Sequence, residues 1–367
     1  MSDISRPINP HASVRGRGAL ENPSGRFERL NVTVDEAAYA DSLLEENGEA
    51  GHQIRTEVFR DSSKSIVTTN DSPDVGMEAS VNPYRGCEHG CIYCFARPTH
   101  EYMGLSAGLD FEAKIFAKPD APDLLRKKLS SPHWIPKVLM LSGVTDCYQP
   151  IERSLKITRG CFEVLAAFRN PAVVVTKNHL VTRDIDLFKQ LAEHNAISIN
   201  LSITTLDGKL ARLMEPRASR PAMRLKAVEQ LAEAGIRVGI MIGPVLPGLT
   251  EHEIPAILKA AASAGAGNAH YTMLRLPHGV KDLFQTWLDE HYPDRKNKIL
   301  NHLRDMHNGK LYDASFGTRR IGSGIYAQHV ARTMALYKKK YGLDKPRAPL
   351  SLSSFRRDAY ESQMSLF

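Results

Sequence analysis

Short apolar runs alternate with amphipathic stretches along most of the chain. Runs of β-branched and aliphatic residues, bounded by small or polar residues, predict buried strands. These runs cover residues 137–143, 172–177, 197–203, 238–243 and 270–276, after shorter extended pieces at 66–69 and 79–82. Apolar residues at helical spacing predict helices between them. The helices cover 122–129, 154–168, 185–192, 225–232 and 250–264, and the last begins at a capping box formed by Thr250 and Glu253.

This alternation predicts an α/β fold. Near-continuous apolar strands separated by helices are typical of a parallel sheet that helices cover. A closed eight-unit barrel needs more strand–helix units than the chain provides, so we predict an open, partial (β/α)6 barrel. Ligands of such sheets bind beyond the carboxyl ends of the strands, and polar residues at those ends are therefore candidates for a site.

The pattern changes at both ends of the predicted barrel. Residues 1–60 are rich in Pro, Gly, Arg and Asn with weak periodicity, and we predict a loosely ordered arm that carries the basic cluster Arg15–Gly18. Residues 61–277 form the predicted core. Residues 278–367 are predicted to be a mainly helical extension and tail.

The net charge of +7 lies in that extension. Residues 278–367 hold 16 Lys and Arg against 9 Asp and Glu, whereas residues 1–277 hold 32 of each. A basic surface attracts a polyanion such as nucleic acid, and the alternative is a solvated helical surface.

The composition indicates in which cellular compartment the protein would be found. The polar N-terminus has no signal-peptide pattern and no uncharged apolar run approaches about 18 residues, so we expect a cytoplasmic protein without a membrane span. Five cysteines, an odd number, argue against a disulfide framework and fit a reducing compartment.

The strongest chemical signal is the spacing of Cys87, Cys91 and Cys94, which follow a C-x3-C-x2-C pattern in a predicted loop. Thiolates suit iron–sulfur clusters or zinc. An iron–sulfur cube usually takes four thiolates, so three leave one iron open to a small molecule. A zinc knuckle would need a fourth ligand at short spacing, and no second C-x2-C pair exists.

The spacing, with Tyr93 just before the last cysteine, resembles the cluster loop of the radical S-adenosylmethionine (SAM) superfamily. The resemblance implies a [4Fe–4S] cluster on the three cysteines and SAM on the open iron. It also implies that the reduced cluster cleaves SAM to a 5′-deoxyadenosyl radical, which abstracts hydrogen from a substrate. A flavodoxin- or ferredoxin-type electron donor and the partial barrel of this superfamily follow from the same resemblance.

Strand ends supply the remaining candidates for SAM binding. Ser142 and Gly143 follow one strand, where the superfamily often has a glycine-rich motif for the SAM amino group. Lys177 ends the next strand and could pair with the SAM carboxylate, with Arg217 as the alternative. Ser202 could bind ribose hydroxyls, and Gly243 lies in a strand that resembles the adenine-facing one.

Residues 82–248 resemble the spore photoproduct lyase-like branch in particular. The likeness lies in Asn82–Cys87, Thr145–Pro150, Thr176–Asn178 with Arg183 and Asp184, and Glu215–Pro216. It implies chemistry on a nucleic-acid base, with Cys147 as the candidate that returns a hydrogen atom. Two alternatives stay open: radical chemistry on a small molecule or protein, and a zinc-stabilised nucleic-acid-binding protein without catalysis.

The last five residues resemble a bacterial sliding-clamp-binding motif. A glutamine, Gln363, precedes two apolar anchors, Leu366 and Phe367, after a polar linker. Apolar anchors on a tail suit docking into a groove, so the resemblance implies a sliding clamp as a partner.

Overall fold

One large sheet organises the computed structural model, which describes residues 16–27, 54–74, 76–141 and 143–359. In these ranges the sheet has seven strands in the order β10-β9-β8-β7-β6-β3-β2. The strands are β2 (Val67–Thr69), β3 (Ala79–Val81), β6 (Leu139–Leu141), β7 (Ala172–Thr176), β8 (Ile197–Ser202), β9 (Val238–Val245) and β10 (Ala269–Met273). All neighbours from β3 to β10 run parallel, and β2 runs antiparallel to β3.

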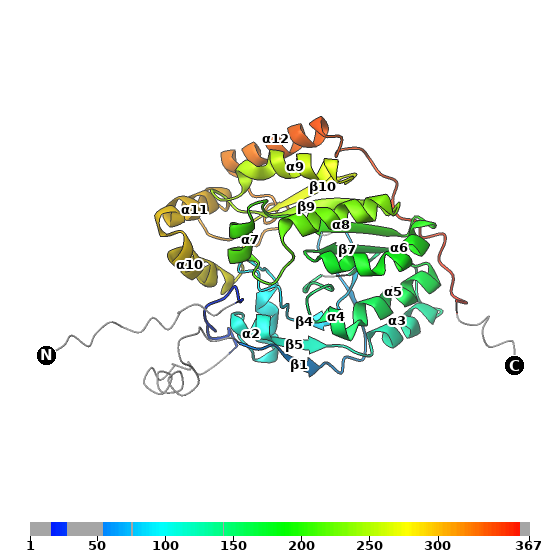
Figure 1. Ribbon diagram of the computed structural model, residues 1–367. Helices are drawn as coiled ribbons and strands as arrows, with labels where there is room; N and C mark the ends of the chain where they lie inside the picture. The colour runs from blue at the N-terminus through cyan, green and yellow to red at the C-terminus, as the bar shows by residue number, and fades with distance from the viewer. Residues whose placement is uncertain (1–15, 28–53, 75, 142, 360–367) are drawn as a thin grey trace, which may run out of the picture.

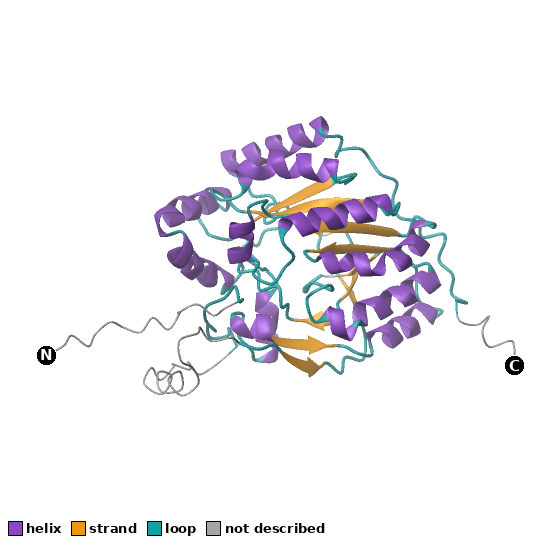
Figure 2. Ribbon diagram, in the orientation of Figure 1, coloured by secondary structure: helices purple, strands orange, loops and turns teal. Residues whose placement is uncertain are grey.

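Helices cover the outer face of this sheet (Figures 1 and 2). They are α3 (Ala121–Ser130), α4 (Glu152–Leu155), α5 (Ile157–Phe168), α6 (Ile185–Ala192), α8 (Pro221–Glu233) and α9 (Ile254–Ser263). Every residue of the central strand β8 is buried. The prediction of a partial (β/α)6 barrel is confirmed.

Shorter elements connect these units or precede them. Three 3-10 helices are described, η1 (Arg97–Met103), η2 (His179–Asp184) and η3 (Glu251–Glu253), beside the short helices α2 (Leu109–Ala113) and α7 (Gly208–Met214). A small second sheet has the order β1-β5-β4, with β1 (Glu57–Arg60), β5 (Lys114–Ala117) and β4 (Tyr84–Arg85). The pattern of apolar residues did not predict this sheet.

Two helix predictions differ from the structure because side chains have tertiary partners. The predicted helix 154–168 is broken at Lys156, and the buried carboxylate of Glu152 accepts the Thr158 amide (3.0 Å) at the start of α5. The predicted capping box is wrong. Thr250 Oγ1 instead accepts the Leu246 amide (2.9 Å), and the Glu253 carboxylate accepts the Thr205 hydroxyl (2.5 Å).

The C-terminal extension is helical, as predicted, with α10 (Val280–His291), α11 (Pro293–Met306) and α12 (Gly324–Lys340). Helix α12 packs on α9 and α11 (Figure 1). The loop before α12 joins the two edges of the large sheet. Arg320 O accepts the Met273 amide of β10 (2.7 Å), and Gly317 N donates to Asp74 in the connection between β2 and β3 (2.7 Å).

Part of the arm predicted as loosely ordered packs against the core. Arg17 and Ala19 are buried, and β1 pairs with β5 along its length. The tail residues Gln363, Leu366 and Phe367 lie outside the described residues, and the sliding clamp stays a prediction. In the described part of the chain, none of the helices is long and apolar enough to cross a membrane.

Candidate cluster and S-adenosylmethionine site

The cysteine loop begins at the end of β4, where the chain must turn sharply. Gly86 has a φ of 78°, and a Cβ there would lie 2.9 Å from Phe111 O, so the position requires glycine. The Cys87 amide donates to Phe111 O (3.0 Å), and the Cys94 amide donates to Cys91 O (3.1 Å). Cys87 and Cys91 are buried, whereas Cys94 is half-buried.

Burial keeps the thiols of Cys87 and Cys91 protonated unless a metal centre is bound. Burial raises the pKa of Cys87, and it raises the pKa of Cys91 to about 12, so thiolates here need a bound cation. In the described ranges, no three His, Cys, Asp or Glu side chains converge as ligands of one ion. A [4Fe–4S] cube would take each of the three cysteines on a different iron.

A buried ion pair fixes the outer side of this loop. The guanidinium of Arg97 contacts the carboxylate of Glu112, and both side chains are fully buried. Arg97 Nε also donates to Cys91 O (3.0 Å). The same carboxylate accepts the backbone amides of Gly18 and Ala19, each at 2.8 Å. The N-terminal segment is therefore part of the support of the loop.

A second pair holds Glu88, which follows the first cysteine. Arg217 Nη2 lies 2.9 Å from Glu88 Oε1, and the Thr56 hydroxyl donates to the same oxygen (2.7 Å). The Ile151 amide donates to the other oxygen (2.5 Å). Arg217, which was one candidate for the SAM carboxylate, thus already has a carboxylate partner in the protein.

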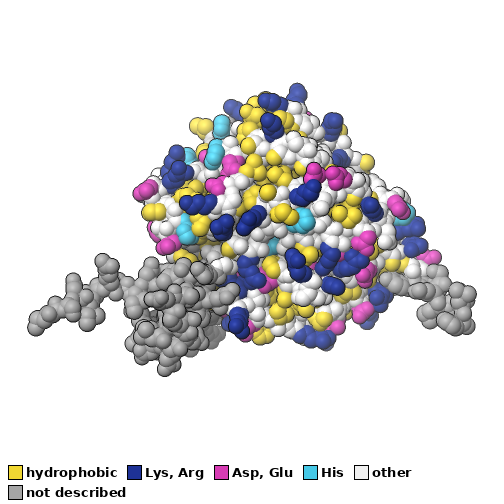
Figure 3. Space-filling view, viewed as in Figure 1, with side chains coloured by type: hydrophobic (Ala, Val, Ile, Leu, Met, Phe, Trp, Pro, Cys, Tyr) yellow, Lys and Arg dark blue, Asp and Glu magenta, His cyan; other side chains and the backbone are white. Residues whose placement is uncertain are grey.

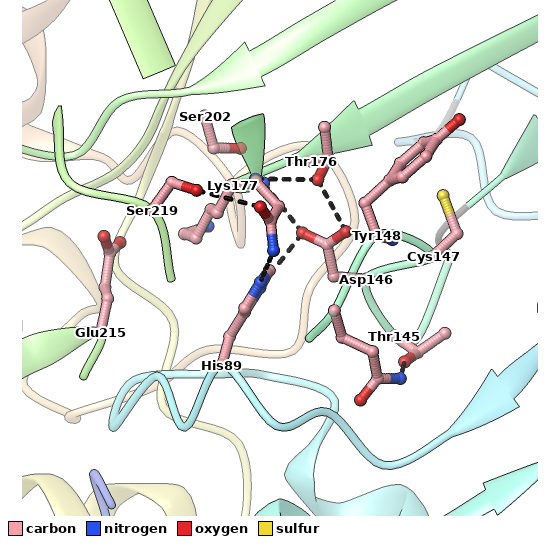
Figure 4. A network of polar contacts seen from close by, with 12 residues as sticks. His89, Thr145, Asp146, Cys147, Tyr148, Thr176, Lys177, Ser202, Glu215 and Ser219 are labelled. Carbon is pink, nitrogen blue, oxygen red and sulfur yellow. Dashed lines mark hydrogen bonds and ion pairs between the residues drawn. The ribbon is translucent and has the colours of Figure 1, made fainter. Parts of the chain in front are cut away.

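His89 joins the loop to the carboxyl end of β7 (Figure 4). Its Nδ1 lies 3.3 Å from Asp146 Oδ2. The Thr176 hydroxyl (2.7 Å) and the Lys177 amide (2.8 Å) donate to Asp146. Burial alone would raise the pKa of Asp146, but His89 and these donors outweigh burial and lower it to about 2.

Glu215 is the centre of a second network of hydrogen bonds and ion pairs, next to β8 and β9. Its carboxylate accepts the Tyr93 hydroxyl, the Thr204 hydroxyl (2.8 Å) and the guanidinium of Arg224. Burial opposes ionisation of Glu215, yet the charges of Arg224 and Lys177 prevail and lower its pKa to about 2. The negative charge of Glu215 is therefore compensated within the site.

This network brings several predicted residues together. Lys177 Nζ lies 5.7 Å from the centre of the Tyr93 ring. Arg224 donates to Ser202 O (2.9 Å), and Thr204 Oγ1 donates to Gly243 O (3.3 Å). Tyr93 of the cysteine loop contacts Glu215 directly, and Arg224 and Thr204 connect Glu215 to Ser202 of β8 and Gly243 of β9.

Gly143 lies on the other side, after β6. Its amide donates to Asn82 Oδ1 (2.9 Å), which ties this strand end to the segment that enters the cysteine loop. Ser142 lies outside the described residues, so its prediction stays open.

The structure does not place the Cys147 thiol with these groups. Cys147 is fully buried in the main hydrophobic core, and in Figure 4 its sulfur points away from Asp146 and His89. The next side chain, Tyr148, donates to Asp184 (2.9 Å). The role of Cys147 as the hydrogen-atom donor stays a prediction, and the burial of its thiol favours a packing role.

Sequence reasoning assigned no role to Glu112, His89, Asp146 or Arg224. Asp146 and Glu215 lie in two of the motifs shared with the lyase-like branch, Thr145–Pro150 and Glu215–Pro216. The carboxylate of Asp146 shortly after a buried strand, and that of Glu215 directly before Pro216, could have indicated a role in the site. Nothing local in the sequence marks Glu112, because its partners Arg97 and Gly18 come from other segments.

Comparison with known families agrees with this geometry. Residues 81–261 match the family described as the radical SAM superfamily. The chain therefore carries a radical SAM domain, and the resemblance of its cysteine loop is confirmed. Proteins of this superfamily use a [4Fe–4S] cluster and SAM, so these are the cofactors of the domain. Such proteins also need an electron donor, and the flavodoxin- or ferredoxin-type donor stays a prediction.

Particular relatives and structures are also similar. An uncharacterized protein of Mycobacterium tuberculosis is 34% identical over 217 residues, which are 59% of this chain and 64% of that protein. One from Methanocaldococcus jannaschii is 28% identical over 67% of this chain and 88% of that protein. The chain thus spans less than two thirds of the length of its mycobacterial relative.

Among solved structures, spore photoproduct lyase shares the fold. Its complex with dinucleoside spore photoproduct gives a TM-score of 0.55 at 17% identity, covering 77% of this chain and 78% of that one. A mutant of the same lyase gives 0.56 at 15% identity, covering 84% and 92%.

Proposed function

We propose that the protein is a radical SAM enzyme that abstracts hydrogen from a base of a nucleic acid. The observation that carries the proposal is the double anchoring of the cysteine loop. His89–Asp146 and Tyr93–Glu215 hold this loop over the carboxyl ends of β7, β8 and β9, where parallel sheets bind ligands. The site thus combines the predicted cluster ligands with the strand ends that would receive SAM.

Cys87, Cys91 and Cys94 would hold the cluster, and Tyr93, Gly143, Lys177, Ser202 and Gly243 would receive SAM. Lys177 is favoured over Arg217 for the SAM carboxylate, because Arg217 is paired with Glu88 whereas Lys177 reaches the Tyr93 ring beside the loop. When bound, the cluster and SAM supply a 5′-deoxyadenosyl radical. The residues of the chain orient SAM and exclude water from the radical.

Three observations support a nucleic acid as the substrate. The solved lyase of the same fold is described in complex with a dinucleoside photoproduct. The excess of Lys and Arg lies in residues 278–367. Figure 3 shows Lys and Arg side chains across the middle of one face, over α7, α8 and α4. Positive surface of this kind attracts phosphates.

The test is hydrogen transfer from the base. The anaerobically reconstituted enzyme is reduced and mixed with SAM and single-stranded oligonucleotides whose bases carry deuterium. Deuterium in 5′-deoxyadenosine, detected by mass spectrometry, is the expected result. Formation of 5′-deoxyadenosine without deuterium from any oligonucleotide would reject the nucleic-acid substrate and favour a small molecule or protein.

A further inference from the structure

Several exposed aromatic rings of this protein each have an arginine guanidinium close to the ring. Phe95, which follows Cys94, is 47% exposed, and the guanidinium carbon of Arg275 lies 4.3 Å from its ring centre. Phe316 is 60% exposed, and Arg319 lies 4.5 Å from its ring centre. Exposed apolar side chains that gather in one part of a surface mark an interaction site.

A third group repeats the arrangement. Phe27 and Tyr102 are 57% and 72% exposed, with ring centres 5.3 Å apart. The guanidinium carbon of Arg26 lies 5.1 Å from the Phe27 ring and 5.9 Å from the Tyr102 ring. Arg26 is held in place by the buried carboxylate of Glu101 (2.5 Å).

These groups are connected across the surface. Arg26 Nη1 lies 3.2 Å from His278 Nε2. His278 lines a hollow of about 430 Å³ together with Lys281, Lys310 and Tyr312. In the described part of the chain, no Asp or Glu lines this hollow. The hollow is thus positively charged and adjoins the Phe27–Tyr102 pair.

Phe95 is linked to the hollow through Arg275, the arginine beside its ring. Leu276 lines the hollow and directly follows Arg275. The Met273 amide donates to Arg320 O (2.7 Å), which places the Phe316–Arg320 loop along the same strand end. Burial lowers the pKa of Arg275, and so do the charges of Arg320 and Arg319. Three guanidinium groups therefore share one neighbourhood, and Asp74 compensates Arg319.

We propose that these groups form one binding surface for single-stranded nucleic acid, which we call the aromatic track. The aromatic track consists of the rings Phe27, Tyr102, Phe95 and Phe316, the arginines Arg26, Arg275 and Arg319, and the hollow with Lys281 and Lys310. It rests on the proposed function, because it delivers a base to the cysteine loop. Rings stack on bases of any sequence while cations follow the phosphates, which is the usual way that proteins hold single strands.

The pattern favours a single strand over two other occupants. A base must leave its stack to reach a buried reaction site, and only unpaired bases can stack on protein rings. A duplex would meet the lysines but not the rings. An acidic electron-donor protein would also meet the positive charges, but it has no need of a planar arginine beside every ring.

The test is equilibrium binding by the full-length protein. The anisotropy of a dye-labelled single-stranded oligonucleotide is measured against a duplex of the same sequence, over a range of salt. The variants are Phe316→Ala and the double variant Phe27→Ala/Tyr102→Ala. We expect each to weaken single-strand binding by about tenfold, with duplex binding less affected. Lys281→Ala should reduce the salt slope by about one.

A matched control is Ile135→Ala, which removes a side chain that is 75% exposed just before β6, at the amino end of the sheet. It should bind like the wild type, and thermal melting should show that all variants fold. Unchanged single-strand affinity in both ring variants would overturn the proposal. The proposal would also be overturned if the ring variants bound oligonucleotides normally but their cluster could no longer be reduced by flavodoxin. That result would assign the surface to the electron donor.

This test does not depend on the reaction. Binding is measured without SAM or a reductant, so it can succeed or fail whether or not deuterium moves from a base. A protein that binds strands through the aromatic track but transfers no deuterium would disprove the proposed reaction alone. A protein that transfers deuterium while the ring variants bind normally would disprove the aromatic track alone.

Discussion

The imidazole of His89 and the carboxylate of Asp146 join the cysteine loop to the end of β7, with Nδ1 and Oδ2 3.3 Å apart. Asp146 also accepts hydrogen bonds from Thr176 and Lys177. One buried carboxylate thus aligns the loop with the strand end that carries Lys177. We therefore expect this contact to set the position of the proposed cluster ligands relative to the proposed SAM-binding residues.

We predict a pH dependence of stability from Asp146. Its pKa is lowered to about 2 from an ordinary 3.8, so ionised Asp146 stabilises the fold above pH 3.8. This stabilisation is lost as the pH falls through 3.8 towards 2. A shift of this size corresponds to about 2 kcal/mol. Urea unfolding of the wild type and Asp146→Asn should differ near neutral pH and converge at the acid end. A difference that is independent of pH would contradict this origin.

The Arg97–Glu112 pair gives a second prediction. Glu112→Gln leaves the guanidinium of Arg97 buried without its counter-charge, which should cost about 3–5 kcal/mol. The loop should loosen, so the iron content after reconstitution should fall as well. Glu229→Gln is the control, because Glu229 forms an exposed pair with Lys226 and should change stability by less than about 1 kcal/mol. Equal effects of the two variants would contradict the supporting role of Glu112.

The close approach of Gly18 to the loop leads to a third prediction. A Cβ at Gly18 would lie 1.7 Å from Gly90 O, so Gly18→Ala must displace the N-terminal segment from Glu112. We expect lower iron retention, measured by iron and sulfide analysis, and a lower melting temperature. Gly208→Ala is the control, since a Cβ there meets nothing within 4 Å. Normal iron retention in Gly18→Ala would show that the segment does not support the loop.

Lys177 and Arg217 should differ in their effect on SAM. Lys177→Ala removes the cation that we assign to the SAM carboxylate, and a charge-assisted hydrogen bond is worth about 1.5–3 kcal/mol. The dissociation constant of SAM, measured by calorimetry on reconstituted protein, should therefore rise by about tenfold or more. Arg217→Ala should chiefly lower the melting temperature, because its partner Glu88 would remain buried. The reverse pattern would assign the SAM carboxylate to Arg217.

Cys147 gives a fifth prediction. Its thiol is packed in the core, so Cys147→Ala should retain the product pattern of the wild type and lose only stability, by about 1 kcal/mol. The reaction products are compared by mass spectrometry. A new product that accumulates in this variant and not in Cys161→Ala would contradict a packing role and support Cys147 as the hydrogen-atom donor.

Local pattern was enough to predict the barrel and the cysteine loop. Apolar runs such as 197–203, bounded by helical patterns, predict buried strands, and the spacing of Cys87, Cys91 and Cys94 predicts the cluster chemistry. The supports of the loop were not predictable, because Glu112 meets Arg97 and Gly18 from three separate segments. The capping box failed for the same reason, since Glu253 bonds Thr205 from another part of the fold.

The most direct test of the account is SAM cleavage by the reconstituted protein. The wild type, Cys91→Ala and Cys161→Ala are loaded with iron and sulfide without oxygen, reduced and given SAM, and 5′-deoxyadenosine is measured. We predict cluster absorbance and 5′-deoxyadenosine from the wild type and Cys161→Ala, and neither from Cys91→Ala. A wild-type protein that binds zinc, forms no cluster and yields no 5′-deoxyadenosine would contradict the account.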